Sequence, residues 1–223
     1  MKTLLRGAVA LLLAGVLAFL FIVIYDAVTA PRVEETVYPN PVVTITMESG
    51  EVMQIELYPD MAPNTVANFI FLINSRFYDG LDFYRVIPGA FVQAGSPTGD
   101  RTGAASYTIA GEFAANGYKW NTLSHRRGVI SMCRSEDYNS ASCQFFILQG
   151  DYPEYDGFYA AFGQLIGEAS YELLDKIASS AVDSYNTPLH RWVMKTVRVD
   201  TFGAEYEHIE YVSPEEETEE ENP

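Results

Sequence analysis

Alternation of apolar and polar residues dominates positions 42 to 201 and predicts a domain built mainly of short strands. Apolar residues alternate over 42–47 and over 52–58, on either side of a Glu-Ser-Gly-Glu segment that is typical of a β-hairpin turn. We expect six further short strands, at 82–87, 91–94, 129–133, 144–148, 160–165 and 193–201. Strand propensity by itself fits a β-sandwich as well as a β-barrel.

Two segments have helical rather than strand spacing. Pro63 is suited to the first position of a helix, and apolar residues follow it three or four positions apart, at Val66, Phe69, Ile70 and Ile73. A second helix is expected over 170–181, with Ser170 as its N-cap. With seven or eight strands, these helices fit a mainly β fold: a closed eight-stranded antiparallel barrel whose openings the two helices cover.

The N-terminal segment is apolar enough to cross a membrane. Residues 7–25 carry no charge, and as a helix they would span ~28 Å, about the thickness of a hydrocarbon core. Lys2 and Arg6 precede the segment, which predicts a cytoplasmic N-terminus and an extracytoplasmic domain held by a single-pass anchor. A signal peptide cleaved after Ala30 is the alternative, and it would give a secreted protein.

The composition divides the chain into four parts. After the short N-terminus and apolar helix (1–25), a proline-containing linker (26–41) leads to the compact domain (42–203). The remainder (204–223) holds nine glutamates, more than half of the net charge of −16. We expect this acidic tail to be a solvated, disordered extension, with weak binding of Ca²⁺ or of a cationic cell wall as the alternative. An acidic surface argues against nucleic acid as a partner.

Polar side chains lie among aromatic and β-branched neighbours in three of the expected strands. Arg85 and Gln93 fall within the segment FYRVIPGAFVQ, and Gln144 falls within SCQFF. Charged and amide groups are costly to bury unless they are hydrogen-bonded. A half-buried arginine beside two amides and several phenylalanines therefore indicates an apolar pocket with a few directed polar groups, which is the usual composition of a ligand site.

These segments, taken in order, resemble the signature blocks of the cyclophilins, the β-barrel peptidyl-prolyl cis-trans isomerases, and most closely those of the bacterial branch. The resemblance covers about residues 42–201. Its blocks are 63–69, 78–80, 83–89, 93–99, 107–109, 111–113, 127–132, 142–147, 155–157 and 161–163. A single block would be weak evidence, whereas the whole series in order with similar spacing is specific.

The resemblance implies a role for each matching residue. Arg85 is expected to stabilise the twisted amide, Gln93 to bind the substrate backbone, and Phe146 to grip the proline ring. An arginine paired with a nearby carboxylate such as Asp82 is the alternative for Arg85. The resemblance assigns the rest of the substrate groove to Ala90, Phe91, Met132, Cys133, Arg134, Gln144, Tyr155 and Tyr159, with Arg134 acting through its backbone.

Several positions depart from the family pattern. Ala90 and Phe91 stand where the family usually has Phe and Met, an exchange that roughly conserves pocket volume and can alter substrate preference. Tyr159 replaces a common His. Glu154 lies at or near the position where cyclosporin-sensitive members carry Trp, so the resemblance predicts weak cyclosporin binding.

The two cysteines and three histidines suggest no cofactor. Cys133 and Cys143 end adjacent expected strands, so they either form a disulfide or remain two free buried thiols. His125, His190 and His208 lack the spacing of metal ligands, and we expect neither a metal nor a cofactor.

Two functions from different classes follow from this reading. In the first, an extracytoplasmic peptidyl-prolyl isomerase acts on proline-containing unfolded or exported polypeptides. In the second, the groove has diverged at Ala90 and Glu154 into a proline-peptide binding or holdase module with little turnover. The presence of Arg85 and Gln93 favours the enzyme.

Overall fold

The strands form where apolar side chains alternate, as the hairpin at the start of the domain shows. Val43, Ile45 and Met47 of β1 are buried while the residues between them are partly exposed. The turn to β2 includes Gly50, whose φ of 87° is a conformation that glycine adopts without strain. The strands are β1 (Val42–Met47), β2 (Val52–Leu57), β3 (Arg85–Ile87), β4 (Phe91–Ala94), β5 (Thr108–Ile109), β6 (Val129–Met132), β7 (Phe145–Leu148), β8 (Ala161–Ile166), β9 (Met194–Asp200) and β10 (Tyr211–Val212).

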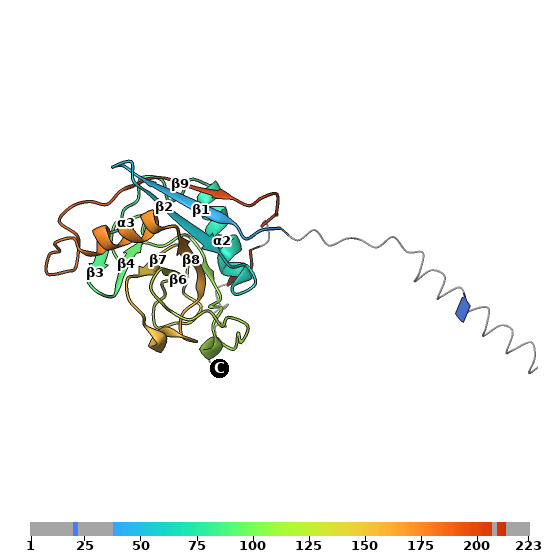
Figure 1. Cartoon of the computed structure of the whole chain (residues 1–223). Helices are drawn as coiled ribbons and strands as arrows, with labels where there is room; N and C mark the ends of the chain where they lie inside the picture. Colours follow the sequence, from blue (N-terminus) through green and yellow to red (C-terminus); the bar gives the residue numbers. More distant parts are fainter. Residues whose placement is uncertain (1–19, 22–37, 207–208, 213–223) are drawn as a thin grey trace, which may run out of the picture. The chain divides into compact units, whose positions relative to one another are not determined.

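The structure is a computed structural model, and it describes residues 20–21, 38–206 and 209–212 (Figure 1). The chain divides into two units, residues 1–37 and 38–223, and every strand among the described residues belongs to the second. Most of the predicted apolar helix, and the expected cleavage site after Ala30, lie outside the described residues. Within the described ranges, no helix is both long and apolar enough to cross a membrane.

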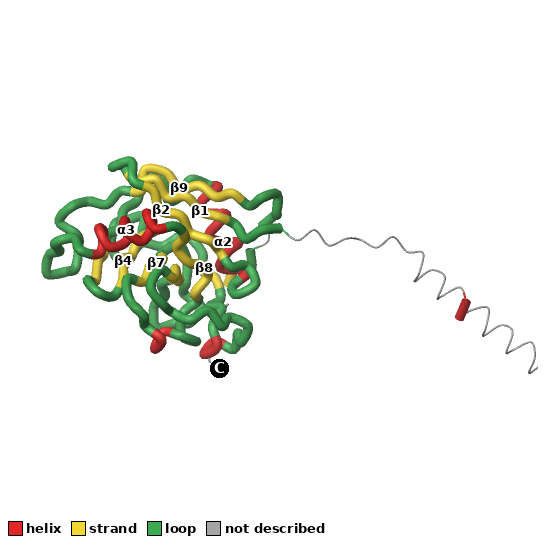
Figure 2. The backbone as a smooth tube through the Cα atoms, in the orientation of Figure 1, coloured by secondary structure: helices red, strands yellow, loops and turns green. Residues whose placement is uncertain are grey.

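Eight strands make one antiparallel sheet in the order β3-β4-β7-β6-β8-β2-β1-β9. The strands are drawn in yellow in Figure 2. The predicted closed barrel is wrong, because the sheet curls without closing: β3 and β9 are its two edges. A single isolated bridge, between Asp82 and Val193, joins the segments that precede these edges. The outer edge of β3 is occupied by a loop, since the backbone N–H of Val86 donates to the carbonyl of Asn186.

Two helices pack against the sheet, as expected. The first, α2 (Pro63–Asn74), begins at the predicted proline and contacts β9. The second, α3 (Glu168–Ala178), begins two residues before the predicted start and contacts β2 and β8. Ser170 is not its N-cap. Its hydroxyl donates to the carbonyl of Ile166 and accepts from the N–H of Gln54, which ties the first turn of the helix to β2.

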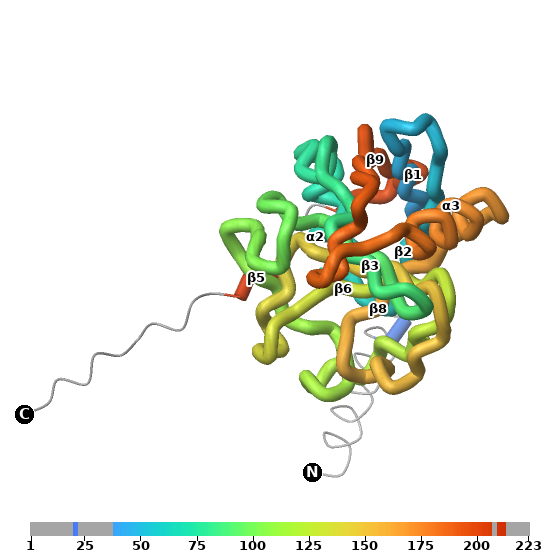
Figure 3. The backbone as a smooth tube through the Cα atoms, turned by 90° about the vertical axis from the view of Figure 1, so that its left-hand side faces the viewer, coloured from blue at the N-terminus to red at the C-terminus, as the bar shows by residue number. Residues whose placement is uncertain are grey.

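The ordered domain extends further toward the C-terminus than predicted. We expected the disordered tail to begin at residue 204, but β10 pairs with β5 and lies beside it (Figure 3). The rings of Tyr107 and Tyr211 are 4.6 Å apart, and the N–H of Glu210 donates to the side chain of Asn64. Aromatic packing therefore fixes residues 209–212 to the domain although the surrounding sequence is acidic.

The apolar residues divide into two clusters on opposite faces of β7. Phe145 faces the main core, where its ring is 5.3 Å from Phe69 of α2. Phe146 faces the other way, into a small cluster with Val129, Leu148 and Ala161. Successive side chains of a strand point to opposite faces, so a pair of phenylalanines supplies one ring to each. The small cluster forms the base of the site described next. The other described elements are the short 3₁₀ helices η1 (Ala114–Asn116) and η2 (Pro153–Tyr155).

Candidate functional site

A cavity of about 280 Å³ lies on the face of β3, β4, β6 and β7 that carries Phe146. The ring of Phe146 lies 5.5 Å from Phe91, 5.7 Å from Tyr159 and 6.1 Å from Tyr155, centroid to centroid. Eight residues line the cavity, and all eight were predicted from the sequence: Arg85, Phe91, Gln93, Cys133, Arg134, Phe146, Tyr155 and Tyr159. The cavity is thus an aromatic pocket with polar groups on one side.

Arg85 is positioned by strand register and by an aromatic ring. It lies opposite Gln93 across the β3–β4 pair, and its Nη1 donates to Gln93 Oε1 at 2.9 Å. Its guanidinium carbon is 5.1 Å from the centre of the Phe91 ring. Asp82 is not its partner, because that carboxylate accepts from Arg191 at 2.6 Å. The guanidinium is therefore held beside the cavity, and no carboxylate of the described residues forms an ion pair with it.

Burial affects the charge and the hydrogen bonding of Arg85. Burial lowers the pKa of this guanidinium, and the nearby charge of Arg101 lowers it further. Arginine remains protonated at neutral pH because its ordinary pKa lies above 12. The Nε atom is buried and makes no hydrogen bond with any described residue. The protein thus leaves part of the donor capacity of Arg85 unused.

An amide network fixes Gln93. Its Nε2 donates to Gln144 Oε1 at 2.9 Å, and the hydroxyl of Tyr84 bridges the two amides, accepting from Gln93 and donating to Gln144. Gln144 Nε2 in turn donates to the carbonyl of Gly103 at 2.6 Å. Burial raises the pKa of Tyr84, so its hydroxyl keeps its proton and remains a donor. Gln144 therefore supports Gln93 from behind and ties the loop at Gly103 to the site.

The side chain of Arg134 lies at the wall of the cavity. Its guanidinium carbon lies 4.6 Å from the ring centre of Tyr159 and 4.8 Å from that of Tyr138. Its Nε donates to the carbonyl of Phe158 at 3.0 Å. Cation–π contacts and this hydrogen bond hold the side chain against the wall of the cavity. That its backbone binds the substrate stays a prediction.

Three predicted groove residues do not line this cavity: Gln144, which lies behind Gln93 and lines the adjoining cavity instead, Met132 and Ala90. Met132 is 1 % exposed and belongs to the main core, because it pairs with Phe145 and shares the face of that residue. Its assignment to the substrate groove is wrong. Ala90 is buried in the turn between β3 and β4 and is not among the lining residues, since its side chain ends at Cβ. Glu154 is exposed in η2 beside Tyr155, and the cyclosporin prediction that rests on it stays untested.

The two cysteines are free, so of the two alternatives the disulfide is the one that the structure contradicts. The register of β6 and β7 explains this outcome. Met132 lies opposite Phe145, and the N–H of Cys133 donates to the carbonyl of Gln144. Cys133 is therefore one position out of register with Cys143, and the two thiols belong to different apolar clusters. Burial raises the pKa of Cys133, which keeps this thiol protonated.

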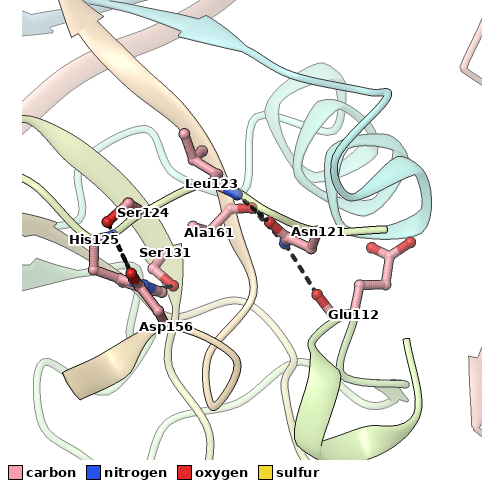
Figure 4. Close-up of polar contacts among 8 residues, drawn as sticks. All are labelled: Glu112, Asn121, Leu123, Ser124, His125, Ser131, Asp156 and Ala161. Atoms are coloured by element: carbon pink, nitrogen blue, oxygen red, sulfur yellow. Dashed lines mark hydrogen bonds and ion pairs between the residues drawn. The ribbon is translucent and has the colours of Figure 1, made fainter. Parts of the chain in front are cut away.

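A buried polar network lies beneath the aromatic floor, and the sequence did not predict it (Figure 4). His125 is fully buried: its Nδ1 is 2.9 Å from Asp156 Oδ1, and its Nε2 is 3.1 Å from Ser131 Oγ. Its ring stacks on Phe146 at 6.4 Å with an interplanar angle of 18°. Ser131 is also fully buried, so this Ser-His-Asp set has no access to a substrate. We infer that it supports Phe146.

The charge state of His125 gives a pH-dependent prediction. Burial lowers the pKa of this imidazole although Asp156 favours the charged form. A histidine whose pKa is lower in the folded state stabilises the fold above the unfolded value, near 6.5, and loses that contribution as the pH falls. The wild type should therefore lose more free energy of unfolding between pH 7.5 and 5.5 than His125→Gln, in urea titrations.

The substitution should also cost stability at pH 7.5. His125→Gln disturbs two buried side-chain hydrogen bonds, and we expect a loss of about 1–3 kcal/mol. Equal pH dependence in the two proteins would contradict a buried neutral imidazole. Burial raises the pKa of Tyr155, which contacts the His125 ring, so this phenol stays protonated over the same pH range.

Comparison with known proteins identifies relatives of this domain. The sequence model of the cyclophilin type peptidyl-prolyl cis-trans isomerase/CLD family matches residues 42–199. A peptidyl-prolyl cis-trans isomerase B of Bacillus subtilis is 42% identical over 119 residues, which are 53% of this chain and 79% of that protein. A putative bifunctional phosphatase/peptidyl-prolyl cis-trans isomerase of Streptococcus pyogenes is 32% identical over 196 residues, 76% of this chain but only 41% of that protein.

The fold has solved counterparts. A cyclophilin type peptidyl-prolyl cis-trans isomerase of Cryptosporidium parvum superposes with a TM-score of 0.65 at 27% sequence identity. The match covers 72% of this chain and 98% of that structure. The same protein crystallised in the presence of the dipeptide Ala-Pro gives a TM-score of 0.63 at 28% identity.

Proposed function

The chain belongs to the cyclophilin-type peptidyl-prolyl cis-trans isomerases, and on that basis we propose that it isomerises X-Pro bonds in polypeptides exported across a membrane. In this proposal an N-terminal helix anchors the enzyme, and the domain of residues 42–203 lies on the extracytoplasmic side. The substrates are unfolded or newly exported chains whose folding waits for proline isomerisation. No covalent intermediate and no cofactor take part.

The chemistry requires preferential binding of a twisted amide. Rotation about a peptide bond meets a barrier of about 18–20 kcal/mol because the C–N bond has partial double-bond character. X-Pro bonds have nearly balanced isomers but still take tens to hundreds of seconds to interconvert. Twisting the amide removes the conjugation and returns a lone pair to the prolyl nitrogen. A donor fixed near that nitrogen stabilises the twisted state more than either planar state, which is what lowers the barrier.

The observation that carries this proposal is the position of Arg85. Its guanidinium is fixed by Gln93 and Phe91 at the edge of the aromatic cavity, and no ion pair with a carboxylate neutralises it in the described part of the chain. In our proposal the proline ring enters the cavity over Phe146, and the prolyl nitrogen then faces Arg85. Gln93 binds the substrate backbone while the other half of the bond rotates.

The proposed location rests on the sequence of the N-terminal segment. Residues 7–25 are uncharged, and Lys2 and Arg6 precede them. An apolar stretch of this length with positive charges before it is typical of a helix that leaves its N-terminus in the cytoplasm. Cleavage after Ala30 would release the same domain, so the two cases differ in attachment and not in the side of the membrane.

A paired experiment tests activity and location with the full chain. Expressed in a bacterium, the chain should be found in the membrane fraction. Protease added to spheroplasts or protoplasts, whose cytoplasmic membrane is intact, should digest the domain. The purified chain in detergent should accelerate isomerisation of an Ala-Pro test peptide, followed by NMR exchange. Recovery of active protein in the soluble cytoplasmic fraction would contradict the location and leave the activity standing.

A further inference from the structure

A second cavity, of about 270 Å³, adjoins the aromatic one and contains three arginines. Arg85 and Arg134 line both cavities, and Arg101 lines the second together with the hydroxyl-bearing residues Thr102 and Ser140. Because the two cavities share the side chains that separate them, a peptide whose proline occupies the first extends over the second. The second cavity is therefore placed to receive a neighbouring side chain of the substrate.

No ion pair neutralises these arginines. Within the part of the chain that the structure describes, the ion pairs involve Arg127, Arg191 and Arg198 but not Arg85, Arg101 or Arg134. Two of the carboxylates that are close to these arginines in sequence make local hydrogen bonds instead. Asp100 accepts from the hydroxyls of Thr98 and Thr102, and Asp137 accepts from the N–H of Asn139.

The guanidinium groups keep donors for a ligand. Arg134 is held by the ring of Tyr159, and its Nε and Nη1 donate to the carbonyls of Phe158 and Ser135. A guanidinium has five N–H donors, so most of those on Arg134 are not used by these contacts. The side chain of Arg101 is exposed, while its carbonyl accepts from Gln144. A carboxylate is the group whose geometry and charge suit such donors best.

We propose that the second cavity binds an aspartate or glutamate side chain of the substrate, within about three residues of the isomerised proline given the extended rise per residue. This inference rests on the proposed function and specifies its substrate class. Arg101 and Arg134 are the residues that determine the preference. The cavity is positively charged, whereas the whole chain has a net charge of −16. The charge of the whole chain disfavours the binding of acidic peptides.

The arginines of the second cavity therefore predict a preference for acidic peptides, and the overall negative charge predicts the opposite. The test measures kcat/KM of the full chain by NMR exchange on peptides that carry Glu, Gln or Lys at each of three positions on either side of one proline. We expect the Glu peptide to exceed the Gln peptide by about fivefold at one position or more, at low ionic strength. The ratio should fall toward one at high salt, because salt screens exposed charges.

Two variants assign the preference to the cavity. Arg101→Gln removes one positive charge from the cavity and should lower the Glu-to-Gln ratio to about twofold. Arg126→Gln removes the same charge from an exposed arginine that lines neither cavity, and it should leave the ratio unchanged. Because the ratio compares two peptides on one protein, a change in overall activity does not affect the readout.

The failures of the inference and of the proposed function are distinguishable. Isomerisation of the Gln peptide with no preference for Glu at any position overturns the inference and leaves the isomerase activity intact. An equal loss of preference in Arg101→Gln and Arg126→Gln also overturns it, because the effect would then arise from overall charge. Absence of acceleration with every peptide contradicts the isomerase activity itself.

Discussion

Arg85→Ala is expected to lower kcat/KM for an Ala-Pro test peptide by about 10²–10³-fold, the usual cost of removing one positioned transition-state donor. The reason is that this guanidinium is the charged donor that β3 and Gln93 hold at the edge of the aromatic cavity. A donor that acts only on the twisted amide contributes to the rate and little to ground-state binding. The loss should therefore appear mainly in kcat, with the affinity for the peptide nearly unchanged.

Arg85→Lys makes the test more specific. Lysine keeps the positive charge but lacks the planar set of donors, so it cannot bond Gln93 and face the prolyl nitrogen with the same geometry. We expect it to recover only a small part of the activity. Arg126→Ala, which removes an exposed arginine outside the cavity, is the matched control and should retain full activity.

The outcome also separates the enzyme from a peptide-binding module. If Arg85→Ala were as active as the wild type while remaining folded, the proposed role of the arginine would be wrong. If a folded wild type bound proline peptides without accelerating their isomerisation, the holdase alternative would be favoured. Thermal unfolding of each variant establishes that a loss of activity is not a loss of fold.

Local sequence pattern predicted the strands well because their burial alternates. The bounds of seven of the eight sheet strands differ from those expected by at most one residue, and β3 alone starts three residues late, at Arg85. Residues 82–84 have the composition of a strand. The N–H of Phe83, however, donates to the carbonyl of Trp192, which lies outside the regular strand pairing of the sheet. The sheet stays open because β3 and β9 form no regular ladder with each other. Closure depends on how distant edges meet, and periodicity within one strand carries no information about that.

The errors at the site have a common physical cause, which is the register between strands. Whether Met132 faces the cavity or the core, and whether Cys133 faces Cys143, each depends on a shift of one residue between β6 and β7. The resemblance to a family located the right segments. It did not tell, for every side chain, which face of the sheet that side chain is on. Arg85, Gln93 and Phe146 all line the cavity, as the resemblance implied, while their roles in catalysis stay predictions.

The residues that were missed are those that act through other residues. Tyr84 stands next to Arg85, and its hydroxyl joins Gln93 to Gln144. An aromatic residue beside a predicted catalytic arginine was the available signal. His125 offered no such signal, because its partners Ser131 and Asp156 are brought to it by different strands and loops.

Glu112 is the second position at which we expect a large effect, and the effect is on stability. The helix α2 has no side-chain cap of its own, since Ala62 occupies the N-cap position. The carboxylate of Glu112 takes that role from a distant loop: Oε1 accepts from the N–H of Asn64 at 3.0 Å, and Oε2 accepts from the N–H and the hydroxyl of Thr65 at 2.7 and 2.6 Å. Asn121 holds the carbonyl of Glu112 in turn (Figure 4).

Glu112→Ala should lower the free energy of unfolding by about 3 kcal/mol, because it leaves two backbone donors and a hydroxyl without their acceptor at a site that is 5 % exposed. Glu112→Gln is the matched control. A carboxamide keeps one acceptor oxygen, which can serve Thr65, but its NH2 group cannot accept from the N–H of Asn64. Burial raises the pKa of Glu112, so the fold disfavours its charge, and we expect this variant to lose only about 1 kcal/mol. Urea titrations at pH 7 measure both losses. Equal losses would contradict this expectation, because they would show that the one oxygen a carboxamide keeps does not preserve the cap. Since Glu112 does not line the cavity, the folded fraction of either variant should isomerise Ala-Pro at the wild-type rate.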